Sequence, residues 1–284
     1  MSNVKKLKTS DRQAIAQKVV GVLKKHYKGN PPKIHFPTLE TLLFAAVLEN
    51  SPVPAAEEAF EQLQKGFHDL NEIRVSSISE IEEALGPIQD VGVKAVRIRE
   101  VLQFTFEKFF AFDLEQLRRK TADVVDKQLA KVRHLTPFMK LFLQQHSLGA
   151  HAVPIDDKSR DVLAWLGLVE PTATVDAAAE DLKHVIRKAD TDAFVHILRQ
   201  FATDPLYKGK FRLSASAEPD PLTAAERLNA FFANPSAKVA APKVVKTKKP
   251  EPPAAQAPKR TAKPAEKSAA PTKVTKPKPV AKKK

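Results

Sequence analysis

The sequence predicts an all-α protein with a separate basic tail, and three observations carry that prediction. Apolar residues recur at spacings of three and four along most of the first 236 residues, the period of a helix that buries one face. Alternating apolar and polar runs bounded by turns, which mark strands, are absent. The composition changes near residue 237 to lysine, alanine and proline. We therefore expect an N-terminal helix and linker (1–37), a helical body (38–236) and a tail (237–284).

The first helix is expected to begin in a capping box, Ser10-Asp11-Arg12-Gln13, and to end before Gly29. The segment 30–37 contains three prolines and is predicted to be a linker. Further helices are predicted near residues 38–49, 54–67, 79–85, 92–110, 113–120, 122–131, 136–146, 157–167, 174–188, 190–203 and 221–233.

The tail holds most of the net charge of +14. Residues 237–284 contain 15 Lys or Arg, two acidic residues, nine prolines and no aromatic residue, whereas the first 236 residues carry 32 bases and 31 acids. Such a segment can neither build a core nor sustain a helix, so we expect it to be disordered. A polycation binds DNA by releasing counterions; the alternative is a tail that only keeps the protein soluble. The tail residues expected to contact DNA include Lys248, Lys249, Lys259, Arg260, Lys282, Lys283 and Lys284.

Composition excludes several classes of site. The chain has no Cys, which rules out disulfides, thiolate zinc sites, iron–sulfur clusters and Cys nucleophiles. Neither GxxxxGK[ST] nor GxGxxG occurs, so we expect no nucleotide cofactor, and we predict no metal or other cofactor. The longest uncharged apolar runs are too short to cross a bilayer, so we expect a soluble, intracellular protein without a membrane partner.

Two segments carry a resemblance to a known family. The run VPIDDKSRDVLAWLGLV, from Val153 to Val169, resembles the (F/V)-P-V-D-T-H-V-x-R-V-L-x-R-L-G-L-V signature of the helix-hairpin-helix DNA glycosylases, the endonuclease III superfamily. Upstream, Leu85-Gly86-Pro87-Ile88 and Val93-Lys94-Ala95 resemble the I-x-x-x-G-x-x-x-x-K-A-x-x-I pattern of that family. The likeness covers residues 38–204. It implies a two-lobed helical glycosylase fold that binds double-stranded DNA in base-excision repair.

The resemblance places the family's hairpin, L-P-G-V-G-x-K, on the segment from Val132 to Phe138, where both glycines are missing. In the family, those glycines let backbone N–H groups approach a DNA phosphate. Pro137 has no N–H to donate, so Arg133, His134 and Thr136 are the predicted DNA contacts here. The alternative interpretation, which we favour, is a plain helix start with Thr136 as N-cap and Pro137 in the first position.

The same register puts Phe138 where the bifunctional members carry their Schiff-base lysine. Lys140 lies two positions on, about 200° around a helix, and is expected to point the other way. A β-lyase reaction through an amine is therefore not expected.

Asp156 aligns with the aspartate on which the family relies, and it is the predicted catalytic residue. A carboxylate there could stabilise the oxocarbenium character that develops when an N-glycosidic bond breaks, or it could activate water. The alternative is that Asp156 only caps the following helix. Asn50 falls where related proteins carry a glutamine that fills the gap left by an extruded base, but an Asn before Ser51-Pro52 also suits a helix C-terminus.

Two functions from different classes follow from these residues. The first is a DNA-repair protein that binds duplex DNA and acts as a monofunctional DNA N-glycosylase through Asp156. The second is a non-catalytic DNA-binding or architectural protein on a degenerate glycosylase scaffold, with affinity carried by the tail. A third, an unrelated interaction module with a solubilising tail, fits less of the sequence. We expect a monomer that lies in the cytoplasm near the nucleoid in a bacterium, or in the nucleus of a eukaryote; the lesion is left open.

Overall fold

The computed structural model describes residues 7–213 and 217–234, and every regular element within that part of the chain is helical. The α-helices are α1 (Thr9–His26), α2 (Thr38–Leu48), α3 (Val53–Gly66), α4 (Leu70–Val75), α5 (Ile78–Leu85), α6 (Val91–Phe109), α7 (Ala122–Leu129), α8 (Pro137–His146), α9 (Asp157–Trp165), α10 (Val175–Lys183), α11 (Thr191–Thr203) and α12 (Ala224–Ala233). Short 3₁₀ turns are η2 (Glu115–Arg119), η3 (Lys188–Asp190), η4 (Pro205–Tyr207) and η5 (Pro221–Thr223). None of the described helices is long and apolar enough to span a membrane.

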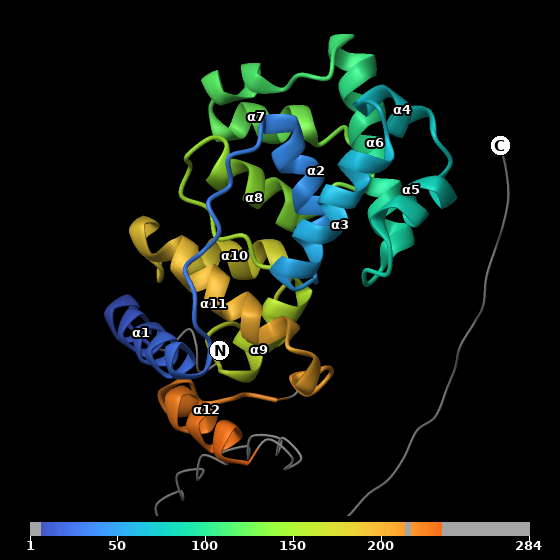
Figure 1. The fold of residues 1–284 in the computed structure, drawn as a ribbon. Coiled ribbons are helices and arrows are strands. Elements are labelled where there is room, and N and C mark those ends of the chain that lie inside the picture. Colours follow the sequence, from blue (N-terminus) through green and yellow to red (C-terminus); the bar gives the residue numbers. More distant parts are fainter. Residues whose placement is uncertain (1–6, 214–216, 235–284) are drawn as a thin grey trace, which may run out of the picture. The chain divides into compact units, whose positions relative to one another are not determined.

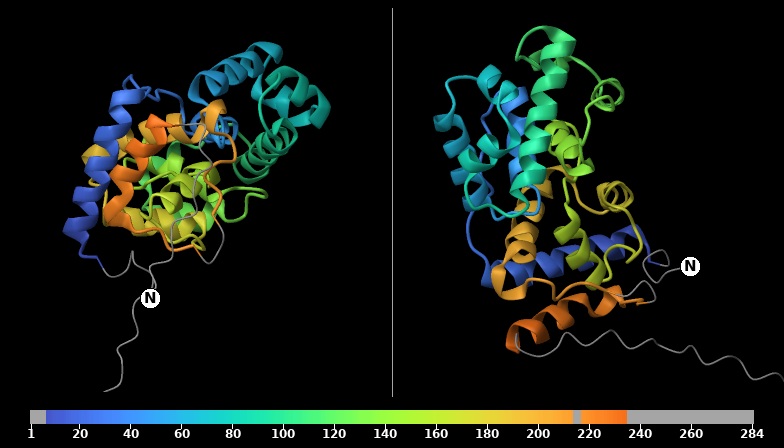
Figure 2. Two further views of the ribbon diagram at one scale, coloured as in Figure 1. Left: turned by 90° about the horizontal axis from the view of Figure 1, so that it is seen from below. Right: turned by 90° about the vertical axis from the view of Figure 1, so that its right-hand side faces the viewer.

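The helices pack around two hydrophobic cores, so the body has the two lobes that the resemblance implied (Figure 1). The first lobe contains α2 to α8, and its core includes Phe44, Phe60 and Leu143. The second lobe contains α1 and α9 to α12, and its core includes Trp165 and Phe201. Figure 2 shows α12 alongside α1 in both views, so the helix before the linker and the last described helix close the same lobe.

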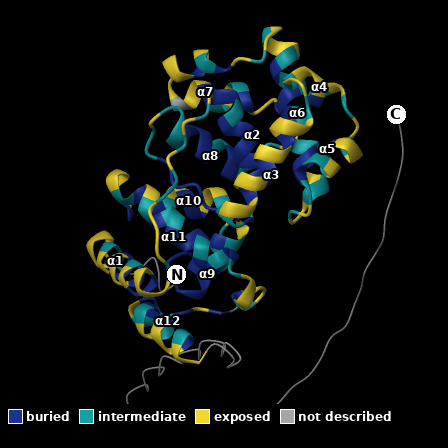
Figure 3. Cartoon of the chain, viewed as in Figure 1, coloured by how far each residue is buried: buried dark blue, intermediate teal, exposed yellow. Residues whose placement is uncertain are grey.

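Helix α2 is the centre of the first lobe. Its sequence, TLETLLFAAVL, is apolar nearly all round, and a helix with that pattern must be covered on every side. It packs against α3, α6 and α8, and every residue of it except Glu40 is buried (Figure 3). Because α2 is held inside the core along its length, Glu49 and Asn50, which follow its last residue, lie at the junction between the lobes.

Helix α9 ends at a glycine that no other residue replaces without strain. Gly167 has a φ of 73°, and its N–H donates to the Ala164 carbonyl while the Leu168 N–H donates to Leu163, which is a Schellman motif. A Cβ on Gly167 would lie 2.6 Å from the carbonyl oxygen of Pro219. The sequence Leu166-Gly167-Leu168 therefore ends α9, and the missing side chain of Gly167 lets the chain before α12 pack closely against this turn.

Several predicted element boundaries differ from the structure. The predicted capping box at Ser10 is wrong, because α1 begins at Thr9 after Lys8 and no side chain caps it. Helix α4 was not predicted; it is one and a half turns long, too short for a periodic signal, and Asp69 caps it. The helix predicted over 174–188 ends at Lys183, and the one predicted over 113–120 is a 3₁₀ turn.

Candidate functional site

Asp156 lies at the junction of the lobes, where it caps α9. Its Oδ1 accepts a hydrogen bond from the Ser159 N–H at 2.9 Å. Its Oδ2 accepts from the Asn50 N–H at 3.0 Å and from Nη1 of Arg199 at 2.7 Å. The residue has no solvent-exposed surface. The predicted cap is thus confirmed, and the carboxylate is held by three donors inside the protein.

Arg199 pairs with this carboxylate inside the second lobe and joins the two lobes through its contacts with Leu48 and Phe138. It extends from α11 in the second lobe, and only 2% of the residue is exposed. Its Nη1 also donates to the Leu48 carbonyl at 3.0 Å, at the end of α2 in the first lobe. The guanidinium lies over the ring of Phe138 in α8, 4.6 Å from the centroid. We call Asp156, Arg199, Phe138 and the backbone at Leu48 and Asn50 the interlobe clasp.

The clasp sets the ionisation of Asp156. Burial alone raises the pKa of a carboxyl group, but the positive charge of Arg199 and the N–H donors of Ser159 and Asn50 favour the charged form more strongly. The pKa of Asp156 is therefore below its ordinary value of 3.8. At neutral pH the pair is a buried, fully ionised salt bridge.

A second, partly buried ion pair, Glu49 with Arg97, adjoins the clasp. The Glu49 carboxylate accepts from Arg97 Nη1 at 2.7 Å and from the Thr136 hydroxyl at 2.9 Å. Lys94, which is 1% exposed, donates through Nζ to the carbonyls of Val47 and Glu49, each at 2.6 Å. Burial raises the pKa of Glu49 and lowers that of Lys94 to about 8. These contacts tie α6 and the α7–α8 turn to the end of α2.

The α7–α8 turn has a left-handed backbone at one of the two positions that the resemblance assigns to glycine, and an extended backbone at the other. The left-handed residue is His134, with a φ of 58°. Thr136 caps α8 by accepting from the Met139 N–H at 3.2 Å, with Pro137 in the first helical position, so the predicted helix start is confirmed. The Thr136 hydroxyl is engaged by Met139 and Glu49, whereas Arg133 and His134 are exposed.

The other predicted residues are placed as follows. Asn50 ends α2 with a φ of 57°, and its Oδ1 accepts from the Lys158 N–H at 3.3 Å. Phe138 is fully buried in the clasp. Nζ of Lys140 lies 3.5 Å from Oδ1 of Asp176 and 3.8 Å from Oδ2 of Asp126, so Lys140 points away from the clasp as expected. Trp165 is a core residue. The tail residues predicted to bind DNA, from Lys248 to Lys284, lie outside the described part of the chain.

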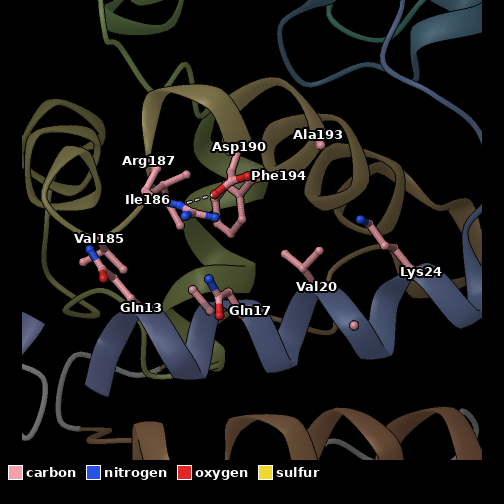
Figure 4. A pocket seen from close by; sticks show the side chains of 12 residues that line it. Gln13, Gln17, Val20, Lys24, Val185, Ile186, Arg187, Asp190, Ala193 and Phe194 are labelled. Carbon is pink, nitrogen blue, oxygen red and sulfur yellow. Dashed lines mark hydrogen bonds and ion pairs between the residues drawn. The ribbon is translucent and has the colours of Figure 1, made fainter. Parts of the chain in front are cut away.

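Two cavities of the described body are lined by residues other than Asp156. A hollow of about 40 Å³ is lined by residues that include Arg199, His146 and His196. Nη2 of Arg199 is buried and has no hydrogen-bond partner among the described atoms. Another, of about 310 Å³, lies between α1 and the start of α11, where Arg187 pairs with Asp190 (Figure 4). Within residues 7–213 and 217–234, no three His, Asp or Glu gather as a metal site would require.

Sequence reasoning missed Arg199 and Glu49. Both are charged residues next to strongly apolar runs, Phe194–Leu198 and Leu42–Leu48. A charge at the edge of a buried helix face needs a partner, because an unpaired buried charge is costly. That signal could have marked both residues as members of an ion pair, but not which acids and bases meet.

Comparison with known proteins identifies the fold. No protein-family model and no curated protein matches the sequence. Among solved structures, a trapped covalent intermediate of endonuclease III with DNA matches with a TM-score of 0.52 at 13% identity, over 69% of this chain and 86% of that one. A non-covalent endonuclease III–DNA complex matches with a TM-score of 0.52 at 14% identity, with the same coverage. A thermostable thymine-DNA glycosylase matches with a TM-score of 0.52 at 11% identity, over 71% and 90%. The predicted endonuclease III-like, all-α glycosylase fold is therefore confirmed.

Proposed function

We propose that this protein binds duplex DNA through a glycosylase fold in which Asp156 holds the lobes together instead of cleaving a glycosidic bond. DNA binding is supported by the fold, since two of the structures that share it are complexes of endonuclease III with DNA. It is also supported by the exposed Arg133 and His134 at the hairpin turn and by the basic composition of residues 237–284. Phosphate contacts of this kind position a protein on DNA without reading sequence.

The observation that carries the non-catalytic part is the burial of Asp156. A carboxylate that stabilises an oxocarbenium ion or activates water must face the sugar. The carboxylate of Asp156 instead accepts from Arg199, Asn50 and Ser159 and has no exposed surface. The same nitrogen of Arg199 also donates to the Leu48 carbonyl, so turning the carboxylate toward a substrate would break the ion pair and disturb this second contact. Breaking a buried pair leaves an uncompensated charge, so this movement is costly.

The engagement of Lys94 and Lys140 by other groups supports the same proposal. Phe138 stands where a lyase lysine is expected, and it lies beneath the Arg199 guanidinium. Lys94 is buried and donates to two carbonyls, and Lys140 pairs with Asp126 and Asp176. Phe138 has no amine, and the amines of Lys94 and Lys140 are engaged elsewhere. A Schiff base between one of these residues and the sugar is therefore not part of the proposed function.

The second candidate is a monofunctional DNA N-glycosylase. One observation favours it: a carboxylate stands at the N-cap of α9, in the register that the resemblance assigns to the catalytic aspartate. In this alternative, DNA binding would displace Arg199 and turn Asp156 toward the substrate. The difference between the two candidates is therefore measurable as base release.

The test is single-turnover base release from a panel of duplexes, each with one damaged base. The wild-type chain is compared with Asp156→Asn and with Asp157→Asn, a matched control in which the neighbouring exposed aspartate loses its charge. We expect the wild type to bind every duplex and to release no base above the level of Asp156→Asn. Release that disappears in Asp156→Asn and persists in Asp157→Asn would overturn the non-catalytic proposal and establish the enzyme.

A further inference from the structure

We propose that a basic hollow beside α9 binds the phosphates of a DNA backbone, an inference that rests on the proposed DNA-binding function. The hollow has a volume of about 490 Å³ and lies between the start of α9 and the segment from η4 to Arg212. Three cationic side chains line it: Lys158, Lys208 and Arg212. We call it the α9 hollow.

Both acidic residues that line the α9 hollow already have an ion-pair or hydrogen-bond partner. Asp161 pairs with Arg160 at 2.6 Å. Asp204 accepts from the Tyr27 hydroxyl at 2.8 Å and from the Leu206 N–H at 2.9 Å. Asp161 is thus paired with Arg160, whereas Asp204 keeps its negative charge, so the three cations that line the hollow outnumber its one carboxylate without an ion pair.

The cations of the α9 hollow, by contrast, lack acidic partners. Lys158 Nζ donates to the neutral Gln89 amide oxygen at 2.7 Å. Among the residues that the structure describes, the exposed side chains of Lys208 and Arg212 form no hydrogen bond or ion pair. The hollow therefore has an excess of positive charge, which an anion would neutralise.

The two lysines also repel each other. Burial lowers the pKa of Lys158, the negative charge of Asp156 opposes this effect, and the positive charge of Lys208 makes a smaller contribution that lowers the pKa. Like charges held around one hollow are stabilised when an anion enters. A phosphate meets this requirement, because it has several acceptor oxygens and can bind more than one cation.

The position of the hollow indicates that the phosphate belongs to DNA. Lys158 is the second residue of α9, and its N–H donates to Asn50 beside the interlobe clasp. The hollow is also open to solvent along the segment that carries Lys208, Gly209 and Arg212, all of which are exposed. A backbone strand can therefore lie across it, whereas the buried clasp admits no strand.

The first experiment uses the full chain and maps lysine protection. An amine-acetylating reagent is applied with no addition, with a duplex, or with inorganic phosphate at the same phosphate concentration, and labelling is read by mass spectrometry. Lys24 and Lys25 on α1 are the exposed reference lysines. We expect the duplex to protect Lys158 and Lys208 more than the reference pair, and inorganic phosphate to protect neither. Equal protection by inorganic phosphate, or by the duplex at all four lysines, would overturn the proposal.

The second experiment measures the salt dependence of duplex binding in the full chain. Lys208→Gln with Arg212→Gln is compared with Lys24→Gln with Lys25→Gln, which removes the same charge elsewhere on the body. We expect only the first pair to reduce the slope of log K against log salt, by about 2 for two lost phosphate contacts. Identical slopes for the two pairs would contradict the α9 hollow while leaving DNA binding intact. A wild-type chain that binds no duplex would instead contradict the proposed function itself.

Discussion

Replacing Arg199 by Met is expected to lower the free energy of unfolding by about 3–5 kcal/mol, because removal of one member of a buried ion pair leaves the other charge uncompensated. In this chain the charge left behind is that of Asp156, which has no exposed surface. The substitution also removes the hydrogen bond to the Leu48 carbonyl and the contact with the Phe138 ring. Urea denaturation followed by circular dichroism measures the loss.

Two comparisons isolate the clasp from the general effect of losing an arginine. Arg187→Met removes an exposed arginine from the same lobe, where its pairing with Asp190 is worth at most about 1 kcal/mol. The double variant Asp156→Asn, Arg199→Met removes both charges and is expected to be more stable than Arg199→Met alone. A loss for Arg199→Met no larger than that for Arg187→Met would show that the clasp does not hold the lobes.

Ending the chain at Pro235 is expected to weaken duplex binding at low salt by a factor of about 100 or more. The deleted segment carries 15 of the 47 Lys and Arg and only two acids, whereas the rest of the chain is almost neutral. The slope of log K against log salt should fall by more than half, since each lost phosphate contact contributes about 0.9. Fluorescence anisotropy with a labelled duplex over a salt series measures both quantities.

The shortened chain is also expected to unfold at the same urea concentration as the full chain. The residues that form both hydrophobic cores end at Phe231, before the deletion. Affinity and salt slope that survive the deletion would assign DNA binding to the body and would leave the tail as a solubilising segment. Residual binding by the shortened chain is expected to depend on the hairpin turn and the α9 hollow.

The sequence predicted those parts of the site that depend on neighbouring residues. Asp156 and Thr136 are helix caps whose partners lie three residues ahead, so local pattern is enough to identify them. The opposite direction of Lys140 follows from helical geometry, whereas Phe138 was placed at the lysine position by the resemblance alone.

The sequence did not predict contacts between distant segments. Arg199 and Asp156 are 43 residues apart, and Thr136 and Glu49 are 87 apart. Which side chains meet depends on how helices that are distant in the sequence pack within each lobe, and local periodicity has no information about that arrangement. The sequence also did not predict the left-handed backbone of His134, because the surrounding turn imposes a conformation that His seldom adopts by itself.

Because of the interlobe clasp, the free energy of unfolding at acidic pH is expected to depend on the protonation of Asp156. Its pKa is lower in the folded chain than the ordinary 3.8, so the stabilisation it supplies is complete above that pH. That contribution is lost as pH falls through the folded pKa, when the carboxyl group takes up a proton and its attraction to Arg199 ends.

The enclosure of Asp156 in the interlobe clasp is tested most directly by carbon-13 NMR of its carboxyl group. The pKa and the chemical shift are measured in the free protein and in the protein bound to a duplex with an abasic-site analogue. Asp156→Asn assigns the resonance. We predict a pKa below 3.8 in the free protein and a chemical shift that does not change when DNA binds, because Arg199 keeps the carboxylate enclosed. A pKa in or above the ordinary range, or a resonance that moves on DNA binding, would mean that the clasp opens and that Asp156 faces the substrate.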